Sequence, residues 1–162
     1  MKVIEMKIAI LYDSKYGNTK QLAEYLAEKM QAGGNEVHLF RTKKSKPAEL
    51  LAFQPEALLV GGPTHMGKPA LTLGRYIKKL GKMGHSSTIR KAAVFNCYTG
   101  NDVCKIIQKQ IFEALPHIEI FEGSLPIRTG SGNGENWKEI ALQNDWKELA
   151  GAFISNFSTI LS

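Results

Sequence analysis

The chain has 162 residues, of which 43% are hydrophobic and 22% charged, and its formal net charge is +6 at pH 7. This length and composition predict a single domain spanning residues 1–162 with an apolar core, and they exclude a disordered chain. The first residues show no signal-peptide pattern and no apolar window is long enough to span a bilayer, so we expect a cytoplasmic protein with no membrane span.

Strands and helices are predicted to alternate along the chain. Short apolar runs predict strands at 7–11, 36–41, 57–60, 91–95 and 118–121, the last continuing over 125–127. Amphipathic spacing predicts helices at 19–31, 48–53, 70–82, 103–115 and 137–161. Asp102 is the expected N-cap of the fourth helix, and Gly151 is a candidate break in the fifth. Five such alternations predict an α/β fold in which helices cover both faces of a five-stranded parallel sheet.

Basic residues are concentrated in the middle third of the chain. Residues 41–91 carry eleven basic side chains and only two acidic ones, Glu49 and Glu56. Such a surface could attract an anionic ligand or an acidic-surfaced partner protein, or it could simply be the solvated face of two helices. No nucleic acid is expected as a partner, because the basic residues are not interleaved with an aromatic or recognition-helix pattern.

The two cysteines, Cys97 and Cys104, lie seven residues apart, with no Cys-x-x-Cys pattern and no histidine cluster nearby. They are expected on a loop and on the first turns of the following helix. This spacing predicts neither a disulfide framework nor a zinc site. Cys104 is interpreted as a small buried hydrophobe, whereas the role of Cys97 stays open.

A possible anion site follows the first predicted strand, at Asp13-Ser14-Lys15-Tyr16-Gly17-Asn18-Thr19-Lys20. The helix that follows offers unpaired backbone N–H groups and partial positive charge, and Ser14 and Thr19 add hydroxyl groups. Gly17 allows the backbone to close around a ligand. These features suit a phosphate, although Ser, Asn and Thr are also common caps of ordinary helices.

Three stretches resemble the flavodoxin-like flavoproteins. The order Ser-x-Tyr-Gly-Asn-Thr at 14–19 resembles the loop that holds the terminal phosphate of FMN in that family. Gly61-Gly62-Pro63-Thr64-His65-Met66-Gly67-Lys68-Pro69 is similar to the Gly-x-Pro-x-x-x-Gly-Lys-x-Pro variant of flavodoxin-domain reductases and protoporphyrinogen-oxidase-like flavodoxins. Phe95-Asn96-Cys97-Tyr98 is similar to family loops of the Phe-Gly-Ser-Tyr kind. The resemblance covers nearly the whole chain.

This resemblance implies a flavodoxin-like three-layer αβα sandwich with strand order 2-1-3-4-5 and FMN as the cofactor. In that order the first, third and fourth strands are neighbours, so the loops that follow them converge on one cleft. The first loop would hold the phosphate and the other two would flank the isoalloxazine ring. No catalytic residue or metal ligand is implied. The implied cofactor-binding residues are Ser14, Lys15, Tyr16, Gly17, Asn18, Thr19, Pro63, Thr64, His65, Met66, Gly67, Asn96, Cys97, Tyr98 and Gly100.

The chain departs from the family pattern in two respects. Many electron-carrier flavodoxins place the flavin ring between aromatic side chains, often with a tryptophan in the second loop, where this chain has Thr64-His65-Met66. Either His65 or Met66 faces the ring, or both are surface side chains, and Tyr98 either faces the ring or packs locally. Carrier flavodoxins are also commonly acidic, whereas this chain is basic.

Other nucleotide and phosphate proteins fit less well. Gly62–Lys68 matches Gly-x-x-x-x-Gly-Lys, but the next residue, Pro69, cannot ligate magnesium. A response-regulator receiver domain requires clustered acidic residues at the strand ends, where only Asp13 is available. A low-molecular-weight phosphatase requires Cys-x5-Arg, which neither cysteine satisfies.

Three functions remain. The first is an FMN-binding redox protein that transfers electrons to or from a partner protein. The second is an FMN-dependent NAD(P)H:quinone or porphyrinogen-type reductase or oxidase, suggested by the form of the second loop and the missing tryptophan. The third is a flavodoxin-fold interaction module with weak or no FMN binding.

Overall fold

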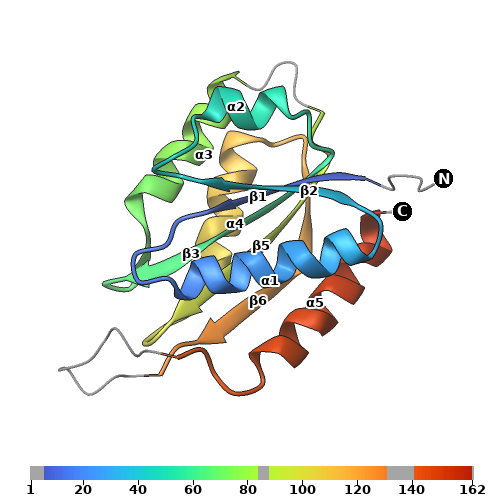
Figure 1. Cartoon of the computed structure of the whole chain (residues 1–162). Coiled ribbons are helices and arrows are strands. Elements are labelled where there is room, and N and C mark those ends of the chain that lie inside the picture. The colour runs from blue at the N-terminus through green and yellow to red at the C-terminus, as the bar shows by residue number, and fades with distance from the viewer. Residues whose placement is uncertain (1–5, 84–87, 131–140, 162) are drawn as a thin grey trace.

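The computed structural model describes residues 6–83, 88–130 and 141–161. That residues 1–162 form a single domain stays a prediction. The elements of the described residues, in chain order (Figure 1), are β1 (Lys7–Tyr12), α1 (Asn18–Ala32), β2 (Glu36–Arg41), α2 (Pro47–Ala52), β3 (Ala57–His65), β4 (Lys68–Pro69), α3 (Leu71–Met83), β5 (Lys91–Tyr98), α4 (Cys104–Ala114), β6 (Glu119–Arg128) and α5 (Trp146–Leu161).

Five strands form a parallel sheet in the order β2-β1-β3-β5-β6. Numbered by the five predicted strands, this order is 2-1-3-4-5, so the predicted α/β fold is confirmed. The sixth strand, β4, is two residues long and pairs antiparallel with the end of β3. The strand order reverses between β1 and β3, and in sheets of this kind ligands bind at the carboxyl ends of the strands beside such a reversal.

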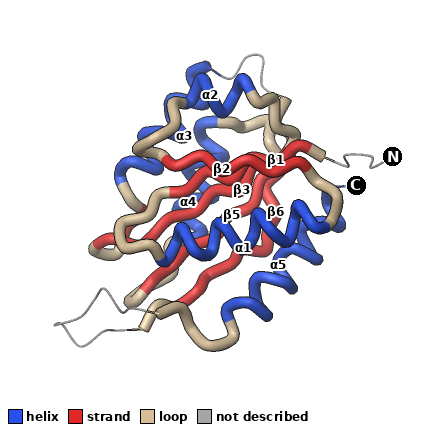
Figure 2. The backbone as a smooth tube through the Cα atoms, in the orientation of Figure 1, coloured by secondary structure: helices blue, strands red, loops and turns tan. Residues whose placement is uncertain are grey.

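Helices cover both faces of the sheet (Figure 2). Along β1, Ile8 and Ile10 belong to the core beneath α1 and α5, whereas Ala9 and Leu11 belong to the core beneath α2, α3 and α4. All four side chains are fully buried, which explains why a central strand of a parallel sheet is apolar at successive positions. In the described ranges, no helix combines the length and the apolar character needed to cross a membrane.

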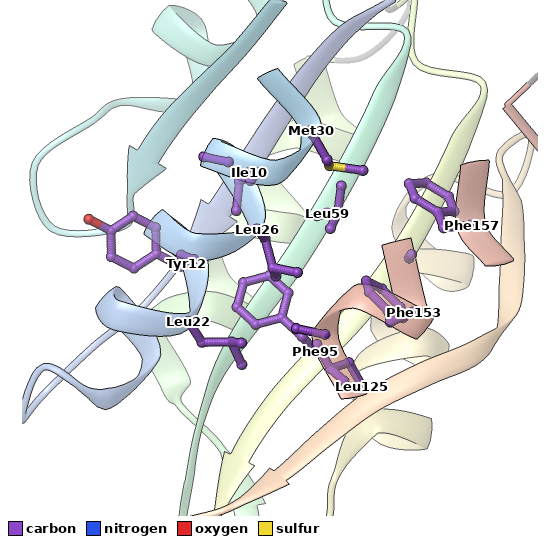
Figure 3. Packing of buried hydrophobic residues seen from close by; sticks show 14 of the residues in the cluster. Ile10, Tyr12, Leu22, Leu26, Met30, Leu59, Phe95, Leu125, Phe153 and Phe157 are labelled. Carbon is purple, nitrogen blue, oxygen red and sulfur yellow. The ribbon is translucent and has the colours of Figure 1, made fainter. Parts of the chain in front are cut away.

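The core beneath α1 and α5 contains a group of aromatic rings (Figure 3). Phe157 of α5 is fully buried, and its ring centroid lies 5.7 Å from that of Phe121 on β6 and 6.2 Å from that of Phe153. Leu22 and Leu26 of α1 are buried in the same core. These contacts hold α5 against the sheet.

The last helix begins later than predicted. Residues 141–145 are not helical, so the predicted start at 137 is wrong for them, while residues 137–140 lie outside the described residues. Leu142 instead forms a β-bridge with Thr129, and the Gln143 N–H donates to the Arg128 carbonyl at 2.9 Å. These contacts with the end of β6 compete with helix formation. The predicted break at Gly151 is also wrong, because α5 continues through it.

Among the other boundaries that differ from the predictions, those of β3, β5 and α4 concern residues of the predicted loops. β3 and β5 extend beyond their predicted ends, to His65 and Tyr98, so Cys97 lies on a strand and not on a loop. The N-cap of α4 is Val103, one residue after Asp102. The Asp102 carboxylate still accepts the N–H of Cys104 at 2.7 Å, so it serves the helix start from the preceding position.

Replacing Phe157 tests the packing of α5. We expect Phe157→Ala to lower the free energy of unfolding by about 3–5 kcal/mol, because it leaves a cavity among buried rings. The matched control is Phe112→Ala, since Phe112 is 58% exposed, and its effect should stay below about 1 kcal/mol. Urea denaturation of the two variants measures both values, and equal losses would contradict this description of the core.

Candidate functional site

The strands β1, β3 and β5 end beside one another at the carboxyl edge of the sheet (Figure 1). The residues at these strand ends line a cleft. Its volume is about 170 Å³. Each of the three predicted loops contributes to it. The lining residues are Ser14, Lys15, Tyr16, Asn18, Thr19, Pro63, Thr64, His65, Cys97, Thr99 and Thr129.

Ser14 organises the first loop from a buried position. Its Oγ accepts hydrogen bonds from the backbone N–H groups of Gly17 and Lys20, each at 3.2 Å. A hydroxyl oxygen accepts two hydrogen bonds and donates one. With both acceptor positions used inside the loop, the O–H hydrogen is the group that Ser14 can offer to a ligand.

Helix α1 leaves two of its N–H groups for such a ligand. The first four N–H groups of a helix have no partner within it. Here Lys20 donates to Ser14 Oγ and Gln21 donates to the Gly17 carbonyl at 2.9 Å. No other residue in the described ranges accepts a hydrogen bond from the N–H of Asn18 or of Thr19. These two donors, at the positive end of the helix dipole, favour an anion.

Gly17 adopts a conformation that other residues rarely reach. Its φ is 92°, and a Cβ built on it would meet no atom within 4 Å. Glycine is therefore required here by the backbone conformation and not by lack of space.

Contacts from the end of β2 hold the first loop in place. Arg41 Nη2 donates to the Ser14 carbonyl at 2.7 Å, and the Thr42 hydroxyl donates to Asp13 Oδ1 at 2.9 Å. The guanidinium group adds positive charge behind the loop. Asp13 itself is buried and does not line the cleft.

The second predicted loop is a hairpin. Thr64 pairs with Pro69 and His65 pairs with Lys68. The two residues of the turn, Met66 and Gly67, have φ values of 51° and 76°. Positive φ at both positions is the pattern of a type I′ turn.

Because of this hairpin, only some of the predicted residues of the second loop line the cleft. Pro63, Thr64 and His65 line the cleft, whereas Met66 and Gly67 lie at the tip and do not. The Met66 side chain is fully exposed. Of the two interpretations offered for it, the position at the tip favours a surface side chain.

Asn96 lies beneath the cleft and is fully buried. Its Nδ2 donates to the Gly62 carbonyl at 2.9 Å, and its Oδ1 accepts the Val103 N–H at 3.0 Å. The side chain also lies within 3.2 Å of Thr64 Oγ1. Asn96 therefore orders the ends of β3 and β5, and direct contact between this residue and a cofactor stays a prediction.

Of the other predicted residues of the third loop, one lines the cleft and two do not. Cys97 lines the cleft, but Tyr98 and Gly100 do not. The Tyr98 ring lies 5.7 Å from the Arg128 guanidinium, which is a local packing contact. In all, the cleft brings together nine of the fifteen predicted residues, and it leaves out Gly17, Met66, Gly67, Asn96, Tyr98 and Gly100.

Sequence reasoning missed two residues that line the cleft, Thr99 and Thr129. Thr99 lies inside the predicted third loop. Its position there and its hydroxyl group could have identified it from the sequence. Thr129 follows β6, and its N–H donates to the Tyr98 carbonyl at 2.8 Å. No motif in the sequence indicated that this strand end would reach the cleft.

The residues present fit a phosphate ester. Two unpaired N–H groups, several hydroxyl groups and Lys15 meet in a cleft with no acidic lining residue among those described. A volume of about 170 Å³ is below the roughly 300–1,000 Å³ of typical ligand sites, so the enclosed part suits one end of a larger molecule. Together with the sheet order, such a site defines a flavodoxin-like protein.

Comparison with known proteins agrees with this class. A family model described as a flavodoxin domain matches residues 9–122. The chain belongs to this family, and the cofactor that this membership implies is FMN.

Individual relatives were also found. The chain is 31% identical over 112 residues to a diflavin flavoprotein of Thermosynechococcus vestitus, a match that covers 65% of this chain and 18% of the relative. It is 34% identical over 71 residues to a flavodoxin of Aquifex aeolicus, covering 43% of this chain and 37% of the relative. The chain therefore spans well under half the length of these relatives.

A solved structure supports the fold. The structure of a flavodoxin from the domain Archaea superimposes with a TM-score of 0.73 at 20% sequence identity. The match covers 97% of this chain and 100% of the other.

The thiol of Cys97 provides a test of the cleft wall. Burial raises the pKa of Cys97 to about 12, against a smaller opposing effect of its hydrogen bond with Thr19. Burial also raises the pKa of Cys104. At pH 8 the thiolate fraction of Cys97 is then roughly 10⁻⁴, and only the thiolate reacts with disulfide reagents.

We therefore expect neither cysteine of the folded protein to react with Ellman's reagent within minutes at pH 8. Both should react at once in concentrated urea, because unfolding restores the ordinary thiol pKa. The absorbance at 412 nm measures the reaction. Rapid release of one equivalent from the folded protein would contradict this description, because it would show that one of the two buried thiols is accessible.

Proposed function

We propose that this chain binds FMN with the phosphate in the 14–19 loop, and that it transfers electrons to or from a partner protein. The observation that carries this proposal is the pair of unpaired N–H groups at Asn18 and Thr19, two residues that line a cleft at the reversal of strand order. Bound FMN supplies the electron-transfer chemistry, and the protein supplies position and electrostatics. The cytoplasmic location stays a prediction.

The first loop would hold the phosphate mainly through neutral donors. The hydroxyls of Ser14 and Thr19 are buried at the loop, whereas the Lys15 side chain is exposed. A hydrogen bond from a buried neutral donor to a charged group contributes more than an exposed charge pair does. Pro63 to His65 and Cys97 to Thr99 remain as the segments that would flank the flavin ring.

A basic rim beside the cleft suits an acidic-surfaced partner. Met66 is fully exposed and Leu71 is 73% exposed. Both border a hollow that is also lined by Lys15, Lys43 and Lys68. Because Lys15 lines the cleft as well, a partner bound here would lie next to the flavin site, with apolar contacts at the centre and charges at the edge.

A second candidate is an FMN-dependent NAD(P)H:quinone or porphyrinogen-type reductase. The residues of the second loop that line the cleft are Pro63, Thr64 and His65, and Thr99 of the third loop is exposed there. No tryptophan lines the cleft among the described residues, so a small substrate could reach the ring. Steady-state oxidation of NADH or NADPH with a quinone tests this candidate, and its absence with several acceptors would count against an enzyme.

Titration with FMN, followed by quenching of its fluorescence, is the direct test of the first proposal. We expect Thr19→Ala to weaken FMN binding by about tenfold, because it removes a hydroxyl donor to a charged group. Lys15→Ala should weaken it by less than about fivefold. The reverse ranking would show that a side-chain charge holds the phosphate. If the wild-type protein does not bind FMN, the proposal is wrong, and of the three functions only the flavodoxin-fold interaction module remains.

Charge reversal at Lys68 tests the basic rim. With the FMN-loaded, reduced protein, we expect Lys68→Glu to slow reoxidation by ferricyanide severalfold at low salt, because the rim attracts anions to the cleft. Lys29→Glu is the matched control, since Lys29 lies in the last turn of α1, away from the carboxyl edge of the sheet. Stopped-flow absorbance measures both rates. Equal slowing in both variants would indicate an effect of net charge alone.

A further inference from the structure

A second pocket, here called the basic pocket, lies between the segment 42–47 and helix α3, outside the cofactor cleft. Its volume is about 320 Å³. Half of its lining residues are cationic and none is acidic. The lining residues are Thr42, Lys43, Lys44, Ser45, Lys46, Pro47, Thr72, Arg75, Tyr76 and Lys79.

The cations of the basic pocket lack counter-charges. All five are exposed, and none forms an ion pair with another described residue. Like charges gathered in this way repel one another, and a bound anion relieves that repulsion. The backbone of the segment 42–47 is held at Lys44 and Ser45, whose N–H groups donate to the Arg41 carbonyl at 3.0 and 2.9 Å.

Tyr76, which lines the same pocket, carries a buried hydroxyl that lacks a partner among the described residues. Tyr76 is only 4% exposed, and its hydroxyl makes no hydrogen bond within the part of the chain that the structure describes. A buried polar group without a partner is unfavourable, and a hydrogen bond to a ligand would remove that cost. Burial, aided by the nearby Glu49 carboxylate, raises the pKa of Tyr76 to about 12. The hydroxyl is therefore a donor at neutral pH.

We propose that the basic pocket binds a small phosphate-bearing molecule, separately from the cofactor cleft. Lysine and arginine charges together with hydroxyl donors are the groups that recognise phosphate. A volume of about 320 Å³ lies within the roughly 300–1,000 Å³ of small-molecule sites, which is more than a single ion requires. The Glu49 carboxylate acts on Tyr76, but Glu49 does not line the basic pocket, whose lining holds five cations.

Calorimetric titration of the FMN-saturated protein with inorganic pyrophosphate tests the proposal, since FMN then occupies the cofactor cleft. Ionic strength is matched with sodium chloride. We expect one saturable site. Tyr76→Phe should weaken binding about tenfold, because a hydrogen bond to a charged group is lost, and Lys79→Ala should weaken it severalfold. The control Lys78→Ala removes the same charge from the same helix outside the basic pocket and should change binding less than twofold.

Thermal unfolding provides a second measurement that does not depend on heat of binding. Pyrophosphate should raise the Tm of the FMN-saturated wild type and raise that of Tyr76→Phe much less.

ADP in place of pyrophosphate distinguishes an organic phosphate from the inorganic ion, and tighter binding of ADP would identify the former. Absence of saturable binding by either probe, or equal weakening by Lys78→Ala and Lys79→Ala, would overturn the proposal. Neither result bears on FMN binding, which the FMN titration decides.

Discussion

The hydrogen bonds of the Ser14 hydroxyl fix the geometry on which the candidate site depends. By accepting the N–H groups of Gly17 and Lys20, Ser14 closes the first loop over the start of α1. The two N–H groups in between belong to Asn18 and Thr19, which line the cleft, and they have no acceptor among the described residues. Because the first turn of a helix always has unpaired donors, the loop selects which donors are satisfied internally and which remain for a ligand.

This selection also explains why neutral donors can hold a charged group here. The backbone donors and the helix dipole do not need to be reorganised when an anion binds, since the fold has already oriented them. Arg41 adds its charge through the Ser14 carbonyl, from the neighbouring strand. The anion site is therefore a property of two adjacent strand ends and not of the loop alone.

Much of this could be predicted from the sequence because it depends on local patterns. The apolar runs located the five parallel strands, and the unbroken run at β1 indicated burial on both faces. Given the strand order, the convergence of the 14–19 loop with the ends of β3 and β5 followed from parallel topology. Nine of the proposed site residues meet in the cleft for that reason.

The remaining features depend on contacts between distant segments. The hairpin of β3 and β4 was not predicted, because the apolar run of β3 ends at Val60 and is followed by Gly61-Gly62-Pro63, and because β4 is only two residues long. The late start of α5 follows from the bridge between Thr129 and Leu142, which no periodicity indicates. Helical spacing likewise does not reveal that the Tyr76 hydroxyl lacks a partner.

The reversal of strand order that creates the cleft adds little to the conformational-entropy cost of folding. Pairing β1 with β3 joins Ile8 to Ala57, 49 positions apart, whereas pairing β5 with β6 joins Lys91 to Glu119, only 28 apart. Loop-closure entropy grows with the logarithm of length, so the longer closure costs only about 0.5 kcal/mol more. A chain of this topology therefore forms a ligand cleft at the centre of its sheet for nearly the same conformational entropy as a simple succession of neighbouring strands.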